Sequence, residues 1–163
     1  MIRTKDITRT AAFVAVAVLL GYVESLFPPV AAGVKLGLAN TVIIVSLYLQ
    51  SVGKTWLIAV LKVLLCMALF GNGAALIYSL SGAVFSLLVM SVAKKTNLFS
   101  LIGVSSLGGV SHNMAQLLCA YVIIGRGVLF YIPVLVVSGA VCGVLTGVAA
   151  QILVRRGDIF GKK

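Results

Sequence analysis

The stretch GGVSHNMAQLLCAYVIIGR, residues 108–126, places polar side chains in the middle of a long apolar segment. It contains His112, the only histidine of the chain, which is followed by Asn113 and, one helical turn later, by Gln116. Polar groups inside a membrane are expensive, so they mark either functional sites or hydrogen bonds between helices. The rest of the chain decides which of these the cluster serves.

The composition predicts an integral membrane protein. Of the 163 residues, 61% are hydrophobic and 10% are charged, and the mean hydropathy is +1.20. Soluble domains are typically about 45–50% apolar and about 25% charged. We expect one transmembrane domain over residues 1–163. The net charge of +10 does not indicate a nucleic-acid partner, because the basic residues lie at the ends of the apolar segments.

Six apolar segments predict an all-α protein with six transmembrane helices, since a span needs about 20 residues. Their bounds are about 10–27, 36–50, 55–71, 74–93, 98–124 and 128–154. Pro28 and Pro29 end the first segment, because proline cannot continue a helix. Glycine, lysine and asparagine turns separate the others.

The basic residues predict the orientation of these helices. With the N-terminus in the cytoplasm, ten basic residues lie on the inner side: Arg3, Lys5, Arg9, Lys54, Lys94, Lys95, Arg155, Arg156, Lys162 and Lys163. Lys35 and Arg126 lie outside, and Lys62 lies within the third segment. Positive charge favours the cytoplasmic side. We therefore expect both termini in the cytoplasm of a bacterial-type plasma membrane.

The unusual polar residues then gather in the outer half of the bundle, which predicts a polar cavity open to the outside. The candidate substrate-binding residues are His112, Asn113, Gln116, Lys35, Asn40, Lys62, Glu24, Asn72 and Arg126. Lys35, Lys62 and Arg126 would make the cavity electropositive, which favours a ligand with a carboxylate or phosphate. Glu24 would hold an amine or pair with one of these bases.

Several of these residues have a structural alternative. Lys35 and Arg126 could extend to the lipid headgroups, and Asn40 and Asn72 could cap helix ends. Hydrogen bonding between helices is the rival explanation for the polar cluster of residues 112–116. Lys62 is too deep to reach the headgroups easily, which favours a cavity or an internal partner.

Two sets of small residues predict close helix contacts. Gly139, Gly143 and Gly147 repeat every four residues, a spacing that lets helix backbones approach closely in lipid. We interpret them as packing positions inside the protein. Ala11 and Ala15 have the same spacing in the first segment. For these alanines, docking to a partner helix is an open alternative to internal packing.

Motifs for catalysis are absent from the sequence. The only acidic residues are Asp6, Glu24 and Asp158, far apart in the chain, and neither an Asp-rich pair nor a P-loop occurs. The cysteines are Cys66, Cys119 and Cys142, and their spacing indicates neither a metal site nor a disulfide framework. We expect no catalytic site, no metal ion and no cofactor.

Two motifs carry a family resemblance that extends over nearly the whole chain. PPVAAGVKLGLAN, residues 28–40, and GGVSHNMAQL, residues 108–117, resemble the Gx transporter family, also called heptaprenyl diphosphate synthase component I. The order of elements also resembles the substrate-binding S component of energy-coupling factor (ECF) transporters. That resemblance implies a six-helix bundle that captures a small molecule from the outer side.

The resemblance also implies partners. In S components the first external loop covers the site, which corresponds to residues 28–35, and small residues of the first helix dock a transmembrane coupling subunit driven by ATPases. Ala11 and Ala15 match those docking positions. The alternative implied by the second family name is a non-catalytic membrane component of heptaprenyl diphosphate or menaquinone synthesis, with a soluble prenyl synthase as its partner.

Overall fold

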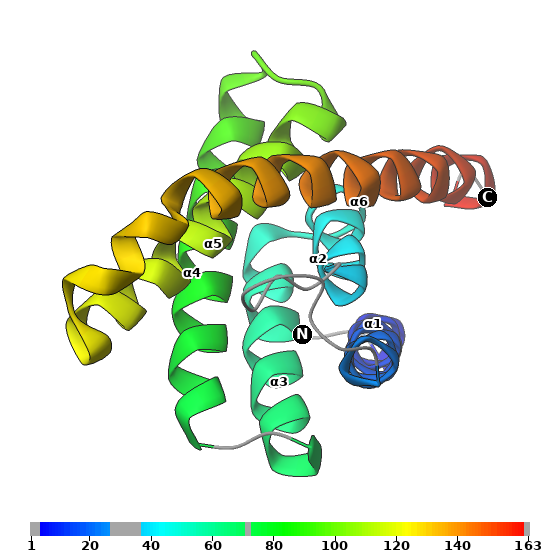
Figure 1. The fold of residues 1–163 in the computed structure, drawn as a ribbon. Helices are drawn as coiled ribbons and strands as arrows, with labels where there is room; N and C mark the ends of the chain where they lie inside the picture. The colour runs from blue at the N-terminus through cyan, green and yellow to red at the C-terminus, as the bar shows by residue number, and fades with distance from the viewer. Residues whose placement is uncertain (1–3, 27–36, 71–72, 162–163) are drawn as a thin grey trace.

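The computed structural model describes residues 4–26, 37–70 and 73–161, and this part of the chain contains helices and no strand. The helices are α1 (Thr4–Ser25), α2 (Leu38–Leu49), α3 (Val52–Phe70), α4 (Gly73–Thr96), α5 (Leu101–Ile124), the 3-10 helix η1 (Arg126–Tyr131) and α6 (Ile132–Gly161) (Figure 1). Lys35, Asn72 and the predicted covering loop at 28–35 lie outside the described residues.

Five helical segments are long and apolar enough to cross a membrane: α1, α3, α4, α5 and the continuous η1–α6 segment. The predicted second span corresponds to α2, which has only 12 residues. At about 1.5 Å per residue it is about 18 Å long, whereas the hydrocarbon layer is about 30 Å thick. The helix lengths thus account for five of the six predicted spans.

The largest differences from the predicted bounds lie at the start of α1 and the end of α6. α1 begins at Thr4 rather than at residue 10, and α6 continues to Gly161 rather than ending at 154. Lysine and arginine are good helix formers, so the helical hydrogen bonds continue into the charged flanks. Hydropathy alone marks the apolar part of a helix and not the helix itself.

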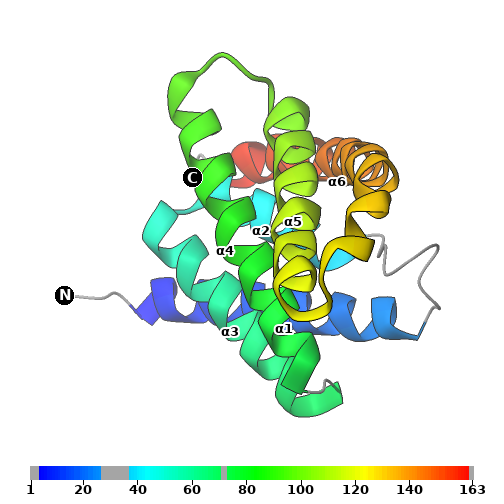
Figure 2. The ribbon, with the colours of Figure 1, turned by 60° about the vertical axis from the view of Figure 1, so that its left-hand side comes forward.

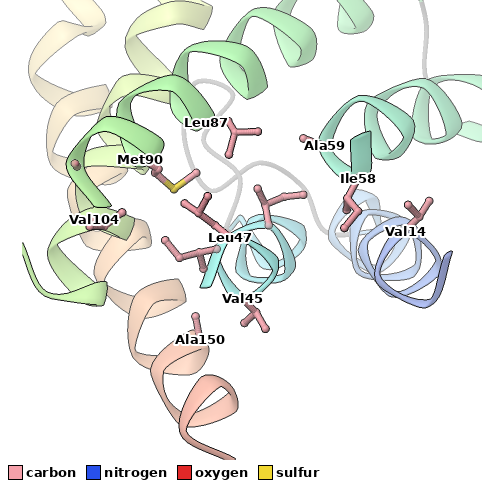
Figure 3. Packing of buried hydrophobic residues seen from close by; sticks show 12 residues of the cluster. Val14, Val45, Leu47, Ile58, Ala59, Leu87, Met90, Val104 and Ala150 are labelled. Atoms are coloured by element: carbon pink, nitrogen blue, oxygen red, sulfur yellow. The ribbon is translucent and has the colours of Figure 1, made fainter. Parts of the chain in front are cut away.

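Helix α2 lies at the centre of the protein. Ala39 and every residue of 41–47 are buried, and α2 provides Ile43, Ile44, Val45 and Leu47 to the hydrophobic core. Around it, the core takes one or more residues from each of the other long helices, among them Val14, Ile58, Leu87, Val104 and Ala150 (Figure 3). A short apolar helix is therefore enclosed by five longer ones.

Two of the longer helices, α1 and α6, run across the others. α1 packs on α2 and α3, and α5 packs between α4 and α6. Figure 1 shows α6 running across α5 and on past α2, and Figure 2 shows α1 crossing α3. The central helix α2 thus lies between α1 and α3 on one side and α6 on the other.

The repeated glycines of α6 face α5. A Cβ atom built on Gly143 would lie 2.6 Å from the Cα of Ser106, and one built on Gly147 would lie 2.9 Å from the Cα of Ile102. A Cβ on Gly139 would lie 2.8 Å from the carbonyl oxygen of Gly109. The two backbones are in direct contact along this ladder, which leaves no room for side chains.

The outer surface of the helices is apolar. Phe130 is 90% exposed, Val122 is 77% exposed, and many other large apolar side chains of α1, α3, α4, α5 and α6 are exposed as well. A monomeric soluble protein rarely exposes such continuous apolar surface. Lipid is the environment in which this surface is stable.

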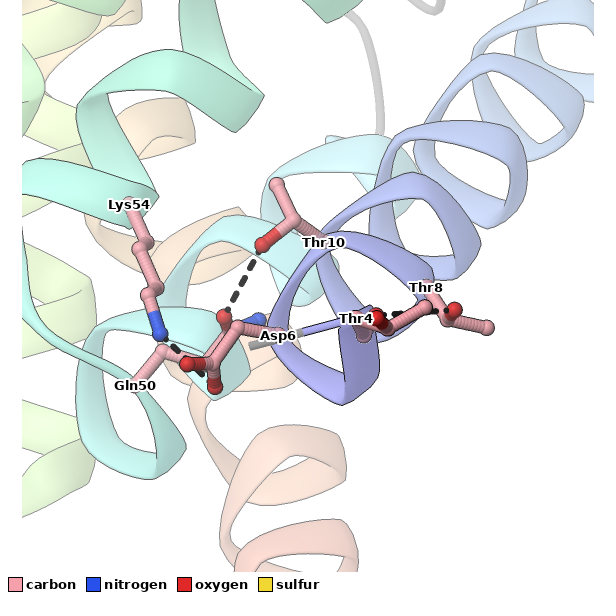
Figure 4. Close-up of polar contacts among 6 residues, drawn as sticks. All are labelled: Thr4, Asp6, Thr8, Thr10, Gln50 and Lys54. Carbon is pink, nitrogen blue, oxygen red and sulfur yellow. Dashed lines mark hydrogen bonds and ion pairs between the residues drawn. The ribbon is translucent and has the colours of Figure 1, made fainter. Parts of the chain in front are cut away.

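The start of α1 is joined by polar contacts to the α2–α3 turn (Figure 4). The Nζ of Lys54 lies 2.9 Å from an Asp6 carboxylate oxygen, and the Thr10 hydroxyl donates to the Gln50 side-chain oxygen at 3.3 Å. Nearby, the Nζ of Lys94 donates to the carbonyl oxygen of Leu47 at 2.6 Å, which satisfies a carbonyl in the last turn of α2.

We expect Lys54→Met to change the thermal stability only slightly. The side chains of Lys54 and Asp6 are 37% and 43% exposed, and exposed ion pairs contribute only about 0.2–1 kcal/mol. Thermal melting of the purified protein in detergent measures this effect. A loss well above 1 kcal/mol would show that this pair is shielded from water.

Candidate functional site

A cavity of about 380 Å³ lies inside the bundle. Its polar lining comes from all six α-helices or their ends: Glu24, Ser25, Asn40, Lys62, Ser79, Ser86, Ser105, His112, Asn113, Gln116 and Thr146. The volume falls in the lower part of the range of about 300–1,000 Å³ that is typical of small-molecule sites. The cavity is therefore large enough for a small organic molecule.

The first residues of α2 form one side of the cavity. Gly37 caps this helix with a φ of 76°, a conformation that favours glycine. The N–H of Gly37 donates to Oε1 of Glu24, at the end of α1. This contact places a carboxylate at the N-terminus of α2, where the helix dipole stabilises negative charge. It also ties the end of α1 to the start of α2.

The only lysine or arginine among the described lining residues is Lys62 of α3. Its Nζ donates to Oδ1 of Asn40 at 3.4 Å. Asn40 lies in the first turn of α2, but its side chain holds this lysine rather than capping its own helix. A cation and an amide from neighbouring helices are thus presented together to the cavity.

The imidazole of His112 lies against the backbone of α4 at Gly82. A Cβ atom built on Gly82 would come within 2.7 Å of Cε1, 2.8 Å of Nε2 and 2.9 Å of Nδ1. These contacts are closer than a real Cβ can make, so the ring occupies the space that glycine leaves. Gly82 therefore sets the position of the histidine in the cavity.

We expect Gly82→Ala to push the imidazole away from α4 with little change in stability, because the ring is the end of a side chain that can rotate and alanine is favoured over glycine in helices by about 0.5–1 kcal/mol. Because the chain has one histidine, the rate of modification by diethyl pyrocarbonate reports on this ring alone. That rate should change in the alanine variant. An unchanged rate would mean that the ring does not depend on Gly82.

Asn113 has a structural role that the sequence left open. Its side-chain nitrogen donates to the carbonyl oxygen of Leu135 at 2.8 Å and lies 3.4 Å from the hydroxyl oxygen of Ser138. These hydrogen bonds join α5 to α6. Asn113 also lines the cavity, but its amide nitrogen is already engaged between helices.

Hydroxyl groups that sequence reasoning missed complete the polar lining. The Ser86 hydroxyl donates to the carbonyl oxygen of Gly108 at 2.9 Å, which joins α4 to α5. Ser105 and Thr146 share a hydrogen bond of 3.1 Å between α5 and α6. The available signal was a serine or threonine close to a helix glycine, which is common in membrane helices and therefore weakly specific.

Two thiols also line the cavity, which the sequence did not indicate. Cys66 of α3 and Cys142 of α6 are both partly buried in its wall, whereas Cys119 is not part of the lining. Among the residues that the structure describes, no group of three or more His, Cys, Asp or Glu side chains is placed to hold a metal ion.

Some candidate residues lie elsewhere. Arg126 begins η1, is exposed and does not line the cavity. Ala11 and Ala15 lie on the exposed face of α1, whereas Thr10, Val14 and Ala17 form its buried face. The alanines are therefore accessible to another helix in the membrane.

The apolar outer surface, the long apolar helices and the polar interior cavity together define a multi-pass membrane protein. The chain belongs to the heptaprenyl diphosphate synthase component I family, whose model matches residues 13–153. The match includes every described residue that lines the cavity. It confirms the family expected from residues 28–40 and 108–117. No curated protein and no solved structure matches the chain.

Proposed function

We propose that this protein is the substrate-binding membrane subunit of an ECF-type uptake transporter, which captures a vitamin-like or isoprenoid-precursor-like molecule from the outer side. The observation that carries the proposal is the cavity of about 380 Å³ with His112, Gln116, Lys62 and Glu24 in its lining. Ionisable and polar side chains inside an apolar bundle commonly mark a substrate site. A cation and a carboxylate in one cavity can bind a polar solute through charge-assisted hydrogen bonds.

The position of the cavity supports capture from outside. Part of its lining comes from the end of α1, the start of α2, the end of α3 and the start of α4, and from there it extends inward to Met90 of α4 and Ser105 of α5. With the N-terminus in the cytoplasm, as the basic residues predict, all of these ends belong to the outer half. The opposite half contains Asp6, Lys54 and Lys94 and their polar contacts.

The short helix α2 fits a sixth, incomplete crossing. Its N-terminus lies beside the cavity, and transporters commonly place the ends of interrupted helices at their substrate sites. In this proposal α2 reaches from the inner side to the floor of the cavity.

Helix α1 is the proposed docking element for a transmembrane coupling subunit that works with ATPases. Ala11 and Ala15 lie exposed on one face of α1, and small residues at this spacing allow close approach of a second helix. No such helix covers this face within the described residues. Purification of the tagged protein from its native membrane should therefore recover a membrane subunit together with ATPases.

A second candidate function follows from the family name. A component of heptaprenyl diphosphate synthase would assemble with a soluble prenyl synthase, and the exposed face of α1 or the helix ends would provide the contact. The same purification separates the two candidates. Recovery of a prenyl synthase without ATPases, together with altered synthase activity on removal of this protein, would favour the second candidate and contradict the first.

The ligand itself provides the direct test. Mass spectrometry of the small molecules that accompany the purified protein should detect a compound absent from a mock purification. If no compound is detected, and none from a panel of vitamins and isoprenoid precursors raises the melting temperature, the cavity is not a capture site.

A further inference from the structure

We propose that the cavity binds a small zwitterion with an apolar body, whose acidic group contacts Lys62 and whose amine contacts Glu24. This inference rests on the proposed capture function and specifies the chemistry of its substrate. It follows from the charges, the apolar walls and the volume of the cavity.

The two charges lie on different helices and are both held in place. The Glu24 carboxylate is oriented by the N–H of Gly37, which donates to Oε1. Among the described residues no hydrogen bond is made to its other oxygen. The Lys62 ammonium is oriented by Oδ1 of Asn40 at 3.4 Å. Both side chains are partly buried and line the same cavity. A ligand between them meets one negative and one positive group.

The remaining walls match an apolar body. Ile44, Val63, Met67, Phe70, Leu76 and Met90 line the cavity alongside the polar groups. Apolar surface removed from water contributes about 25 cal/mol per Å², so an apolar body adds affinity that the polar ends alone cannot supply. The volume of about 380 Å³ limits this body to a small molecule.

A prenyl diphosphate fits this charge pattern less well. A diphosphate carries at least two negative charges, and proteins usually bind it with several lysines or arginines, or with Mg²⁺ held by carboxylates. The described lining has one lysine, no arginine and one carboxylate. The carboxylate of Glu24 also repels an anion.

The test compares ligands that differ in one charge. The full chain is purified in detergent, and its thermal melting is followed with leucine, methionine and phenylalanine. Each free amino acid is compared with its amide, which lacks the carboxylate, and with its N-acetyl derivative, which lacks the ammonium. Isopentenyl diphosphate and inorganic pyrophosphate are measured alongside. We expect at least one free amino acid to raise the melting temperature with an apparent affinity at least tenfold higher than its two derivatives.

Charge variants then connect each group to its residue. Glu24→Gln keeps an oxygen that accepts from Gly37, so the fold should persist, but the preference for the free amine over the N-acetyl form should be lost. Lys62→Met should lose the preference for the free acid over the amide. Lys54→Met removes a lysine outside the cavity and should retain both preferences.

The outcomes are distinguishable. If isopentenyl diphosphate or pyrophosphate stabilises the protein and the amino acids do not, the zwitterion inference is wrong while the capture function stands. If the amino acids stabilise the protein but both variants keep wild-type preferences, the assigned contacts are wrong and the inference falls. If no compound of this set stabilises the protein, the zwitterion inference falls, whereas the capture function falls only if the mass spectrometry and the panel of vitamins and isoprenoid precursors are negative as well.

Discussion

Replacement of Gly143 by valine is expected to destabilise the protein by about 3 kcal/mol, near the upper end of the usual range for overpacking. A Cβ at this position would meet the Cα of Ser106 at 2.6 Å and the carbonyl oxygen of Ser105 at 2.7 Å. Both atoms belong to the backbone of α5, which cannot rotate out of the way as a side chain can. α5 and α6 would have to separate. Thermal melting in detergent measures the loss.

Gly53→Ala is the matched control for this variant. Gly53 lies in the first turn of α3, and a Cβ built on it meets no atom within 4 Å. Alanine is favoured over glycine in helices by about 0.5–1 kcal/mol, so this variant should be as stable as the wild type or slightly more so. If Gly143→Val melts like Gly53→Ala, the close contact of α5 and α6 is not present in solution.

The second large effect is expected in binding. His112→Ala and Gln116→Ala should each abolish the co-purification of the small molecule while the melting temperature stays near that of the wild type. The two side chains are one helical turn apart on α5, and both line the cavity. Loss of a hydrogen bond to a buried polar ligand leaves its partner unsatisfied, which costs about 1–3 kcal/mol per group. Mass spectrometry and thermal melting measure the two quantities separately.

Cys119→Ala is the control on the same helix, because Cys119 does not line the cavity. It should retain the co-purifying molecule. The His112 and Gln116 variants could also lose stability. If they lose folding and binding to the same extent, the polar cluster serves as a hydrogen-bonded contact between helices, as the Asn113 side chain already does with α6.

Much of the fold could be predicted from the sequence, because glycine, proline and charged turns separate apolar segments of helical length. The sequence could not show that α2 is enclosed, since a fully apolar helix looks the same whether it faces lipid or protein. The available hint was the shortness of the predicted segment 36–50, which falls below the about 20 residues that a span needs. The ends of α1 and α6 were also missed, because charged residues continue a helix without apolar periodicity.

The candidate site was predicted less completely. Polar side chains rare in lipid, such as His112 and Lys62, could be selected from the sequence, and the structure places both at one cavity. Arg126 is also a basic residue beside an apolar segment, but it lies outside that cavity. A charged residue at a helix end can face the membrane surface as well as the interior of the bundle. Ser86 and Ser105 were missed, because small hydroxyl residues are common in apolar helices.

The enclosed position of α2 has a consequence for biosynthesis. With 12 residues it is too short to enter the bilayer as an independent span, so it should insert as a hairpin with α3, which begins at Val52. α2 also packs against α6, which leaves the ribosome later than α2. Until α6 arrives, one side of α2 and the hydroxyl of Ser105 lack their final neighbours. Chains interrupted before residue 132 should therefore be recognised by membrane quality control as unfinished.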